Sequence, residues 1–346
     1  VGAVVLRDGA TVAEGWHEGP GMPHAEAMAL AAAGDAARGA TVVCTLEPCS
    51  HHGRTPPCAH ALVAAGVARV VVGLADPLER DRAGGVEVLR AAGIDVAIAD
   101  DPERGDCAAL VAPFLTWALT GRPEVTLKLA TSLDGRIATA TGESRWISGA
   151  AARALVHRWR ADADAVVVGL GTALADDPRL TARGVEGPVR QPARVVFDSS
   201  ARLPLDAALV ADLAAAPVIV LASEEAPADR VRALRAAGVE VELLPGDARE
   251  RVGGGLRALG ARGIQSALVE GGAGLAAAMV EAGAVDRIAW FLAPMLIGGA
   301  GAPSALAGRG VPSLADAPRL AGVAVERVGD DVLVTGRLRP LPGPGR

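Results

Sequence analysis

The stretch that decides how the first part of this chain folds begins at His24-Ala25-Glu26 and continues at Pro48-Cys49 and Cys58. Imidazole and thiolate groups are zinc ligands, and a catalytic zinc keeps three protein ligands and leaves the fourth position to water. Zinc-bound water titrates near neutral pH, and a nearby carboxylate that is not a ligand can move its protons. The stretch therefore predicts one zinc ion per chain, held by His24, Cys49 and Cys58, with Glu26 as proton shuttle.

A plainer interpretation of the same residues is two core cysteines, a surface histidine and a glutamate that stabilises the first turn of a helix. It leaves the spacing of Glu26 and Pro48 without an explanation. A structural zinc site is the other alternative, because such a site has four protein ligands. His51, His52 or His60 would then supply the fourth ligand.

The composition indicates two folded domains without a nucleic-acid-binding or membrane-spanning character. At 346 residues the chain is long for one domain, and its apolar fraction of 51% is enough for sizeable cores. The net charge of −6 argues against a protein that coats nucleic acid, and no run of about 18 apolar residues predicts a membrane span. Four cysteines do not form a disulfide framework and suit a reducing compartment. With no signal-type segment in the sequence, we expect a cytoplasmic protein.

Strand and helix patterns alternate along the chain, which predicts α/β architecture with mainly parallel sheets. The polar stretch around Pro102 marks a domain boundary. We expect a first domain over residues 1–105, from which an N-terminal helix is missing, a linker helix over 106–122, a second domain over 123–340 and a frayed tail over 341–346. The expected strands are 1–6, 11–16, 41–46, 67–74, 94–98, 125–130, 165–168, 194–198, 218–221, 240–244, 266–269, 287–292, 323–328 and 331–336, and the expected helices are 24–33, 58–65, 86–92, 108–120, 149–161, 229–237 and 274–282.

His-x-Glu followed by Pro-Cys and a further Cys is similar to the signature of the zinc nucleobase deaminases. In this chain, however, Ser50–Pro57 separates the two cysteines, where those enzymes have Cys-x-x-Cys. With this insertion, Leu46–Cys58 resembles the bifunctional deaminase/reductase family of riboflavin biosynthesis, and Gly15–Gly19 also matches that family. The resemblance implies a cytidine-deaminase-like, three-layer α/β/α first domain that acts on a phosphorylated pyrimidine.

Residues near the expected zinc site are candidates for substrate contacts. His51 and Arg54 lie in the inserted segment and are suited to binding a phosphate, although a solvated loop arginine is the alternative for Arg54. His17 is either a substrate contact or a surface histidine at the end of a hairpin. Two departures from the family pattern are the absence of an Asn before Val1 and the sequence Asp76-Pro77-Leu78-Glu79, in which Leu78 replaces a substrate-contacting Asn.

The second half resembles the reductase of the same family, which implies a dihydrofolate-reductase-like domain that uses NADPH. No G-x-G-x-x-G follows a strand, so a Rossmann site is not supported. Gly271 and Gly272 are expected where a strand meets a helix, and glycines there would let the backbone approach a pyrophosphate. Tight packing between the strand and the helix explains these glycines equally well. Lys128 is the single lysine of the chain, which suggests a need for a compact ammonium. The matching motifs are Lys128–Arg136, Ser144–Gly149, Asp176–Arg183 and Glu270-Gly271-Gly272.

The resemblance assigns roles to individual residues of the second half. For Arg160 and Arg183 the alternative is an ordinary surface arginine, and for Asp176 it is an aspartate that forms a turn. The expected catalytic residues are Lys128, Asp176 and Glu270, the expected substrate contacts are Ser144, Arg160, Leu180 and Arg183, and the expected cofactor contacts are Ala130, Trp146, Ser148, Asp176, Ser199, Glu270, Gly271 and Gly272.

Taken together, the motifs predict an enzyme that deaminates a ribosylaminopyrimidine phosphate and then reduces its ribosyl group. A tRNA or nucleoside deaminase with an appended domain is the runner-up, and a non-catalytic zinc module is a third interpretation. The resemblance also implies a homodimer, or a larger homo-oligomer, built on the reductase domain, with neither nucleic acid nor membrane as a partner.

Overall fold

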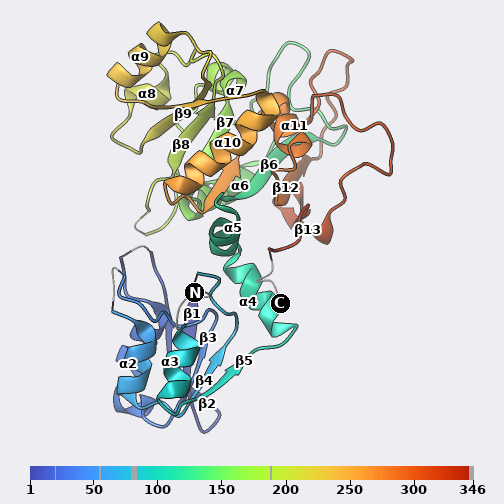
Figure 1. Ribbon diagram of the computed structural model, residues 1–346. Coiled ribbons are helices and arrows are strands. Elements are labelled where there is room, and N and C mark those ends of the chain that lie inside the picture. The colour runs from blue at the N-terminus through green and yellow to red at the C-terminus, as the bar shows by residue number, and fades with distance from the viewer. Residues whose placement is uncertain (20, 54–55, 79–83, 188, 343–346) are drawn as a thin grey trace. The chain divides into compact units, whose positions relative to one another are not determined.

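The computed structural model describes residues 1–19, 21–53, 56–78, 84–187 and 189–342. The chain divides into two compact units (Figure 1). The first comprises Val1–Leu119 with residues 341 and 342, and the second comprises Thr120–Pro340. The division falls inside the segment 106–122 that we expected to connect two domains. Each unit is built on its own sheet.

The sheet of the first unit is mixed, with the strand order β2-β1-β3-β4-β5. β1 pairs antiparallel with β2 and β3, whereas β3, β4 and β5 run parallel. Asp8 and Gly9 both have positive φ angles, 50° and 80°, which suits the tight turn of the β1–β2 hairpin. The strands are β1 (Gly2–Arg7), β2 (Ala10–Trp16), β3 (Thr41–Cys44), β4 (Arg69–Val72) and β5 (Asp95–Ile98).

Three helices of the first unit cover one face of this sheet. Ala29 of α1, Leu62 of α2 and Leu89 of α3 are buried in one cluster with Val42 and Val70 of the strands. Figure 1 shows α2 and α3 next to each other against the sheet. Because α2 follows β3, α3 follows β4 and these two strands run parallel, the N-termini of α2 and α3 lie at the same end of the strands. The helices of the unit are α1 (Ala25–Ala33), the 3-10 turn η1 (Gly34–Ala37), α2 (Cys58–Ala65), α3 (Gly85–Ala91), α4 (Glu103–Leu110) and α5 (Ala112–Thr120).

The sheet of the second unit is mainly parallel, with the order β10-β9-β8-β7-β11-β6-β12-β14-β13. Only the pairs β12–β14 and β14–β13 are antiparallel. The C-terminal hairpin that the sequence predicts is therefore present, and it ends the sheet at β13. The strands are β6 (Glu124–Ser132), β7 (Ala165–Gly169), β8 (Ala193–Phe197), β9 (Val218–Ser223), β10 (Glu240–Leu244), β11 (Ser266–Val269), β12 (Arg287–Ala293), β13 (Ala321–Val328) and β14 (Asp331–Arg337).

Helices bury both faces of the parallel part of this second sheet. Val167 of β7 packs with Leu256 of α10 in one cluster, whereas Val166 packs with Leu234 of α9 in another. A strand that is buried on both faces is continuously apolar, as Ala165–Val168 is in the sequence. The helices are α6 (Ala150–Asp162), α7 (Leu170–Asp176), α8 (Ala208–Ala211), α9 (Ala228–Ala236), α10 (Ala248–Ala261) and α11 (Ala273–Glu281).

The longest helix, α10, was not among the expected elements, and neither was α7. Gly253, Gly254 and Gly255 interrupt the apolar pattern of α10 and lower its intrinsic helix propensity. Packing against the sheet outweighs that cost, since Gly255 is buried close to Phe197 and Leu221. Within the described residues, no helix combines the length and apolar character that crossing a membrane requires.

Candidate active sites

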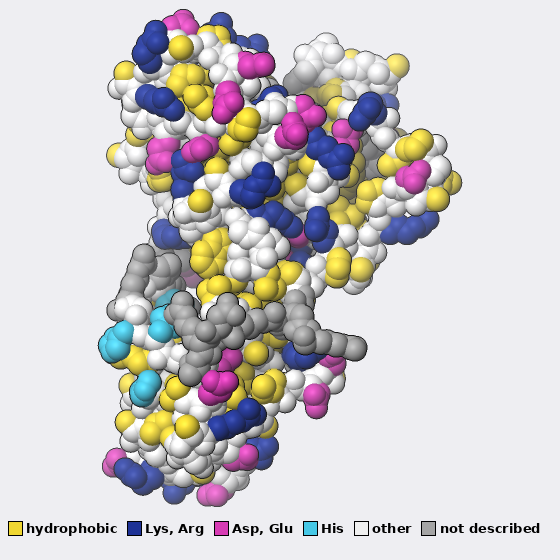
Figure 2. Space-filling model, in the orientation of Figure 1, with side chains coloured by type: hydrophobic (Ala, Val, Ile, Leu, Met, Phe, Trp, Pro, Cys, Tyr) yellow, Lys and Arg dark blue, Asp and Glu magenta, His cyan; other side chains and the backbone are white. Residues whose placement is uncertain are grey.

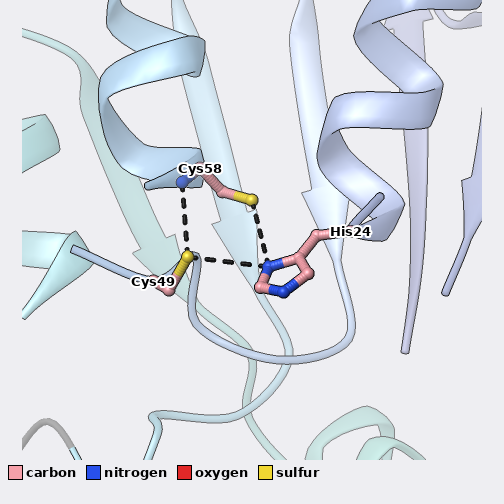
Figure 3. A group of neighbouring side chains, drawn as sticks. All are labelled: His24, Cys49 and Cys58. Atoms are coloured by element: carbon pink, nitrogen blue, oxygen red, sulfur yellow. Dashed lines mark hydrogen bonds between the residues drawn. The ribbon is translucent and has the colours of Figure 1, made fainter. Parts of the chain in front are cut away.

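The three predicted zinc ligands come together in the first unit (Figure 3). His24 directly precedes α1, Cys49 follows the end of β3, and Cys58 is the first residue of α2. The His24 Nδ1 atom lies 3.6 Å from the Cys49 Sγ and 3.4 Å from the Cys58 Sγ. All three possible ligand atoms lie within 4.8 Å of one another.

These distances fit a tetrahedral zinc ion. Zn–S bonds of about 2.3 Å and Zn–N bonds of about 2.0 Å at a tetrahedral angle separate nitrogen and sulfur by about 3.5 Å. Both measured nitrogen–sulfur distances are close to this value. The described residues supply three such ligands in this group, which is the number that a catalytic site uses.

The start of α2 favours negative charge on Cys49. The Cys58 backbone N–H donates to the Cys49 Sγ over 3.3 Å, and this N–H is one of the unpaired donors at a helix N-terminus. The hydrogen bond from the Cys58 side chain lowers the pKa of the Cys49 thiol to about 5, and the same bond raises the pKa of the Cys58 thiol. The pair thus already favours one thiolate, which is the form that binds zinc.

Glu26 lies in the first turn of α1, two residues after the histidine ligand, and only 3% of its surface is exposed. Its side chain is hydrogen-bonded to Cys58. Burial raises the pKa of the Glu26 carboxyl above its ordinary value. A carboxyl in this position can hold a proton closer to neutral pH than an exposed glutamate can.

Of the predicted substrate contacts in this unit, His17 lies beside the metal ligands. Its ring meets the His24 ring edge-on, with 5.3 Å between the ring centroids, and its Nδ1 lies 3.1 Å from the Pro23 carbonyl oxygen. His51 is exposed on the segment between the cysteines. Arg54 lies outside the described residues, as does Glu79 of the Asp76–Glu79 stretch. Leu78 is exposed.

Glu47 is a buried carboxylate that the sequence analysis missed. Its Oε2 accepts a hydrogen bond from the Asp76 N–H over 3.1 Å, and its Oε1 accepts one from the Val86 N–H over 2.9 Å. Gly85 lies against the same backbone, and it has to be a glycine because a Cβ there would lie 1.7 Å from the Pro48 carbonyl oxygen. Glu47 and Gly85 together fix the start of α3 against the backbone that leads to Cys49. The sequence contained a signal for Glu47, because this acidic residue directly follows the expected apolar strand 41–46, and a buried carboxylate requires hydrogen-bond partners.

The second unit contains a cavity of about 1140 Å³, somewhat larger than the roughly 300–1,000 Å³ typical of small-molecule sites. Ser199, a predicted cofactor contact, is exposed after β8 and is not among the residues that line this cavity. All of the other predicted residues of this half line it, namely Lys128, Ala130, Ser144, Trp146, Ser148, Arg160, Asp176, Leu180, Arg183, Glu270, Gly271 and Gly272.

Lys128, Arg160 and Glu270 form the charged centre of the cavity. Arg160 binds the Glu270 carboxylate with two hydrogen bonds, from Nε over 2.6 Å and from Nη2 over 3.0 Å. Burial lowers the pKa of Lys128, and the charge of Arg160 lowers it further, while Glu270 opposes both effects. Burial acts to raise the pKa of Glu270, yet pairing with Arg160 leaves that pKa below its ordinary value.

A second group of polar residues surrounds this centre. The Ser144 hydroxyl donates to the Asp176 carboxylate over 3.4 Å. Leu180 is buried and has a φ of 54°, an uncommon left-handed conformation for a residue with a side chain. Next to it, the Arg183 backbone N–H donates to the His157 Nδ1 over 3.3 Å. Arg160, Arg183 and His157 all line the cavity, so this part of it is basic.

Glycines at the start of α11 shape another wall of the cavity. A Cβ on Gly271 would lie 3.0 Å from the Leu275 side chain, and one on Gly272 would lie 3.2 Å from the Thr172 hydroxyl oxygen. That hydroxyl accepts a hydrogen bond from the Gly272 N–H over 2.9 Å. Thr172, which the sequence analysis missed, also lines the cavity. Exposed backbone at a helix N-terminus fits the pyrophosphate of a dinucleotide, and the cavity has the volume for one.

Two protein-family models match the chain. Residues 123–334 match the "RibD C-terminal domain", and residues 1–74 match the "Cytidine and deoxycytidylate deaminase zinc-binding region". The chain belongs to the RibD family. Its fold class was therefore predicted correctly as a cytidine-deaminase-like unit followed by a reductase unit.

Individual RibD proteins are similar over nearly the whole chain. The riboflavin biosynthesis protein RibD of Aquifex aeolicus is 39% identical over 334 residues, which cover 96% of this chain and 90% of the Aquifex protein. The structure of Acinetobacter baumannii RibD (form 1) superposes with a TM-score of 0.85 at 36% identity, covering 97% of this chain and 91% of that one. The deaminase/reductase structure from Thermotoga maritima, at 36% identity and the same coverage, gives a TM-score of 0.82.

The face of the molecule shown in Figure 2 mixes both signs of charge. Arginine and acidic side chains are interspersed there, and the visible histidines gather on the first unit.

RibD membership favours a deaminase and reductase with small-molecule substrates over the two alternatives, a nucleoside or tRNA deaminase and a non-catalytic zinc module.

Proposed function

We propose that this chain catalyses two consecutive steps of riboflavin biosynthesis. The first is the hydrolytic deamination of 2,5-diamino-6-(5-phosphoribosylamino)pyrimidin-4(3H)-one. The second is the NADPH-dependent reduction of the ribosyl group of 5-amino-6-(5-phosphoribosylamino)uracil to ribityl. The observation that carries this proposal is a His-Cys-Cys group beside a buried glutamate in one unit and a Lys-Arg-Glu cavity in the other, within a RibD-family chain.

In the first unit, His24, Cys49 and Cys58 would hold zinc. When bound, zinc supplies Lewis-acid activation of water. The Glu26 carboxylate would accept a first proton from this water and pass it to the ring nitrogen. It would then take the remaining proton of the added hydroxyl group and pass it to the departing amino group, which leaves as ammonia. His17 is placed beside the His24 ring to contact the substrate, and His51 and Arg54 are proposed to bind its phosphate.

In the second unit, the cavity would hold the deaminated substrate and NADPH together. When bound, NADPH would supply a hydride to C1′ of the ribosylamino group. The bond between C1′ and the ring oxygen breaks, and that oxygen takes a proton, so that the sugar becomes an open ribityl chain. Lys128, Asp176 and Glu270 line the reacting end in this assignment. Arg160 and Arg183 are proposed to bind the sugar phosphate, with Ser144 and Leu180 completing the substrate side. Glu270 thereby also fixes the Arg160 guanidinium by its two hydrogen bonds.

On the cofactor side we assign Ala130, Trp146, Ser148, Gly271 and Gly272, all of which line the cavity. Asp176 and Glu270 are shared between cofactor and substrate. Ser199 is proposed as an outlying contact beyond the cavity. The working boundaries of the two catalytic domains are 1–105 and 123–340, with 106–122 as the linker and 341–346 as the tail, whose last four residues lie outside the described ones.

The decisive experiment follows the two steps separately. Purified protein is incubated with the diaminopyrimidine phosphate while ammonia release and the NADPH absorbance are recorded, with NADH in a parallel reaction. We expect ammonia without any nicotinamide cofactor and NADPH oxidation only after deamination. A folded protein that releases no ammonia, or a zinc site with a histidine in the fourth position, would refute the deaminase. A protein that leaves NADPH unoxidised when given the deaminated substrate would refute the reductase.

We also infer that the protein is a homodimer, built through the second unit and located in the cytoplasm. β13 lies at the edge of its sheet, and its Val323 and Val325 side chains are 55% and 66% exposed. An apolar edge strand favours pairing with a second copy. Light scattering should give a dimer mass that Val325→Lys converts to a monomer mass. The control Leu205→Lys replaces another exposed apolar residue of the second unit, 51% exposed, and should remain dimeric. The four cysteines are free, as a reducing compartment would keep them.

A further inference from the structure

Asp331 is a buried carboxylate that no catalytic assignment uses. It is the first residue of β14, only 1% of its surface is exposed, and its Oδ2 accepts a hydrogen bond from the Gly149 backbone N–H over 2.8 Å. Gly149 is the N-cap residue directly before α6. A carboxylate at this point also complements the positive end of the helix. The C-terminal hairpin is thereby joined to the helix that follows the motif Ser144–Gly149.

Residues 144–148, here called the wall segment, all line the large cavity. Two attachments hold its beginning and its middle, and both come from nearer in the sequence than Asp331. The Ser144 hydroxyl and the Arg145 guanidinium bind Asp176, and the Arg153 guanidinium stacks on the Trp146 ring with 4.5 Å to its centroid. At its end, the Ser148 carbonyl oxygen accepts a hydrogen bond from the Arg153 guanidinium, and the Gly149 backbone N–H, directly after the segment, donates to Asp331, which lies 182 residues further along the chain.

Beside this hydrogen bond, the turn of the C-terminal hairpin packs against the start of α6. A Cβ on Gly149 would lie 3.5 Å from the Asp331 Oδ2, and one on Gly329 would lie 3.0 Å from the Ala151 side chain. Behind them, Val156 of α6 is buried with Leu333 of β14 in one cluster. The turn of the β13–β14 hairpin is thus seated on the first turn of α6.

We propose that Asp331 is a positioning residue for cofactor binding, which holds the Ser148 end of the wall segment through the Gly149 N–H. The inference rests on the proposed NADPH site. Without the carboxylate, the partly buried Gly149 N–H loses its acceptor, and the Ser148 end of the wall segment is left with the hydrogen bond from Arg153 and becomes more mobile. Trp146 and Ser148 then have to be ordered when the cofactor binds, which weakens binding.

The test compares Asp331→Ala with Asp330→Ala, a substitution of the exposed neighbour in the same turn. Hydrogen exchange is measured first, without cofactor. We expect faster exchange in residues 144–150 for Asp331→Ala and unchanged exchange for Asp330→Ala. The dissociation constant for NADPH is then measured by fluorescence titration. Loss of a charged hydrogen bond should raise it by about tenfold or more, while kcat at saturating NADPH changes less than about twofold.

A second variant keeps the test valid if Asp331→Ala does not fold. Asp331→Asn retains an acceptor oxygen but no charge, so we expect a smaller rise of about threefold and a smaller increase in exchange. Ammonia release by the first unit reports that each variant is folded elsewhere. The inference is overturned if a folded Asp331 variant binds NADPH as tightly as the unmodified protein and its wall segment exchanges at the same rate. Failure of the unmodified protein to bind NADPH would instead refute the proposed function.

Discussion

At the scale of single residues, the proposed deaminase site contains one buried carboxylate, Glu26, which lies close to the three proposed zinc ligands and is not one of them. Glu26 is hydrogen-bonded to Cys58, and the three ligand atoms are grouped without it. Its position allows it to exchange protons with a water held by the metal, while burial raises its pKa towards the pH at which the enzyme would work. The same residue could not serve as well on an exposed turn.

Glu26→Gln should lower the rate of ammonia release by about 10²- to 10⁴-fold, because a general acid–base group is lost while its shape is retained. Zinc content, measured by atomic absorption, should stay at one ion per chain. NADPH oxidation with the deaminated substrate should not change. Ammonia release above about a tenth of the original rate, with zinc retained, would rule out the assigned role.

Lys128 gives the reductase a pH dependence with a defined sign. Burial lowers its pKa, so the ammonium loses its charge at a lower pH than an exposed lysine, whose pKa is about 10.4. If the charged form is needed, kcat for NADPH oxidation should fall as the pH rises through this lowered pKa. Lys128→Arg should remove that fall, because arginine stays protonated, although its bulk should reduce the rate.

The pH profile is measured with the deaminated substrate at saturating NADPH. Glu26→Gln is the control, and its reductase profile should match that of the unmodified protein. If kcat of Lys128→Arg falls at high pH in the same way as kcat of the unmodified protein, the group that titrates is not Lys128.

At the scale of elements, α10 shows how packing overrides local preference. Gly260 lies where the helix touches the entry to β6, and a Cβ there would be 2.1 Å from the Gly121 carbonyl oxygen. Gly253, in the same helix, would place a Cβ 3.4 Å from the flexible end of Arg257 and near nothing else. The two glycines therefore have opposite consequences when they are replaced.

Gly260→Ala should lower the free energy of unfolding by about 1–3 kcal/mol, because backbone has to move to admit the methyl group. Gly253→Ala should raise it by about 0.5–1 kcal/mol, because alanine is the better helix former. Denaturant unfolding of the pair measures both values. Equal effects of the two substitutions would contradict the close contact at Gly121.

The same helix also shows what the sequence contained and what was missed. Asp247 and Glu250 form a capping box at its start, a pattern that is visible in the sequence three residues apart. The glycines hid it, since they break the apolar periodicity that identifies most helices. The C-terminal hairpin was easier, because Gly329 and Asp330 separate two strand patterns and form a turn signal.

At the scale of the whole molecule, each unit has its own core and its own site. Removing zinc with a chelator should abolish ammonia release, whereas NADPH oxidation with the deaminated substrate should stay within about twofold. Adding zinc back should restore the first activity. A parallel loss of both activities after chelation, measured on protein that remains folded, would show that the two sites are not independent.

The sequence by itself determined the fold class, the three proposed zinc ligands that the structure brings together and a set of polar residues and glycines that line the second cavity. Short motifs such as His24-Ala25-Glu26 and Pro48-Cys49 are sufficient for this, because local spacing fixes which side chains begin a helix or follow a strand. Tertiary structure alone decided the partners that lie far apart in the chain. Glu47 binds backbone beyond the next strand, and Asp331 reaches Gly149 across the sheet. Buried carboxylates find such partners only when the sheet is assembled, since burial without a hydrogen bond is costly and local spacing does not encode the contact.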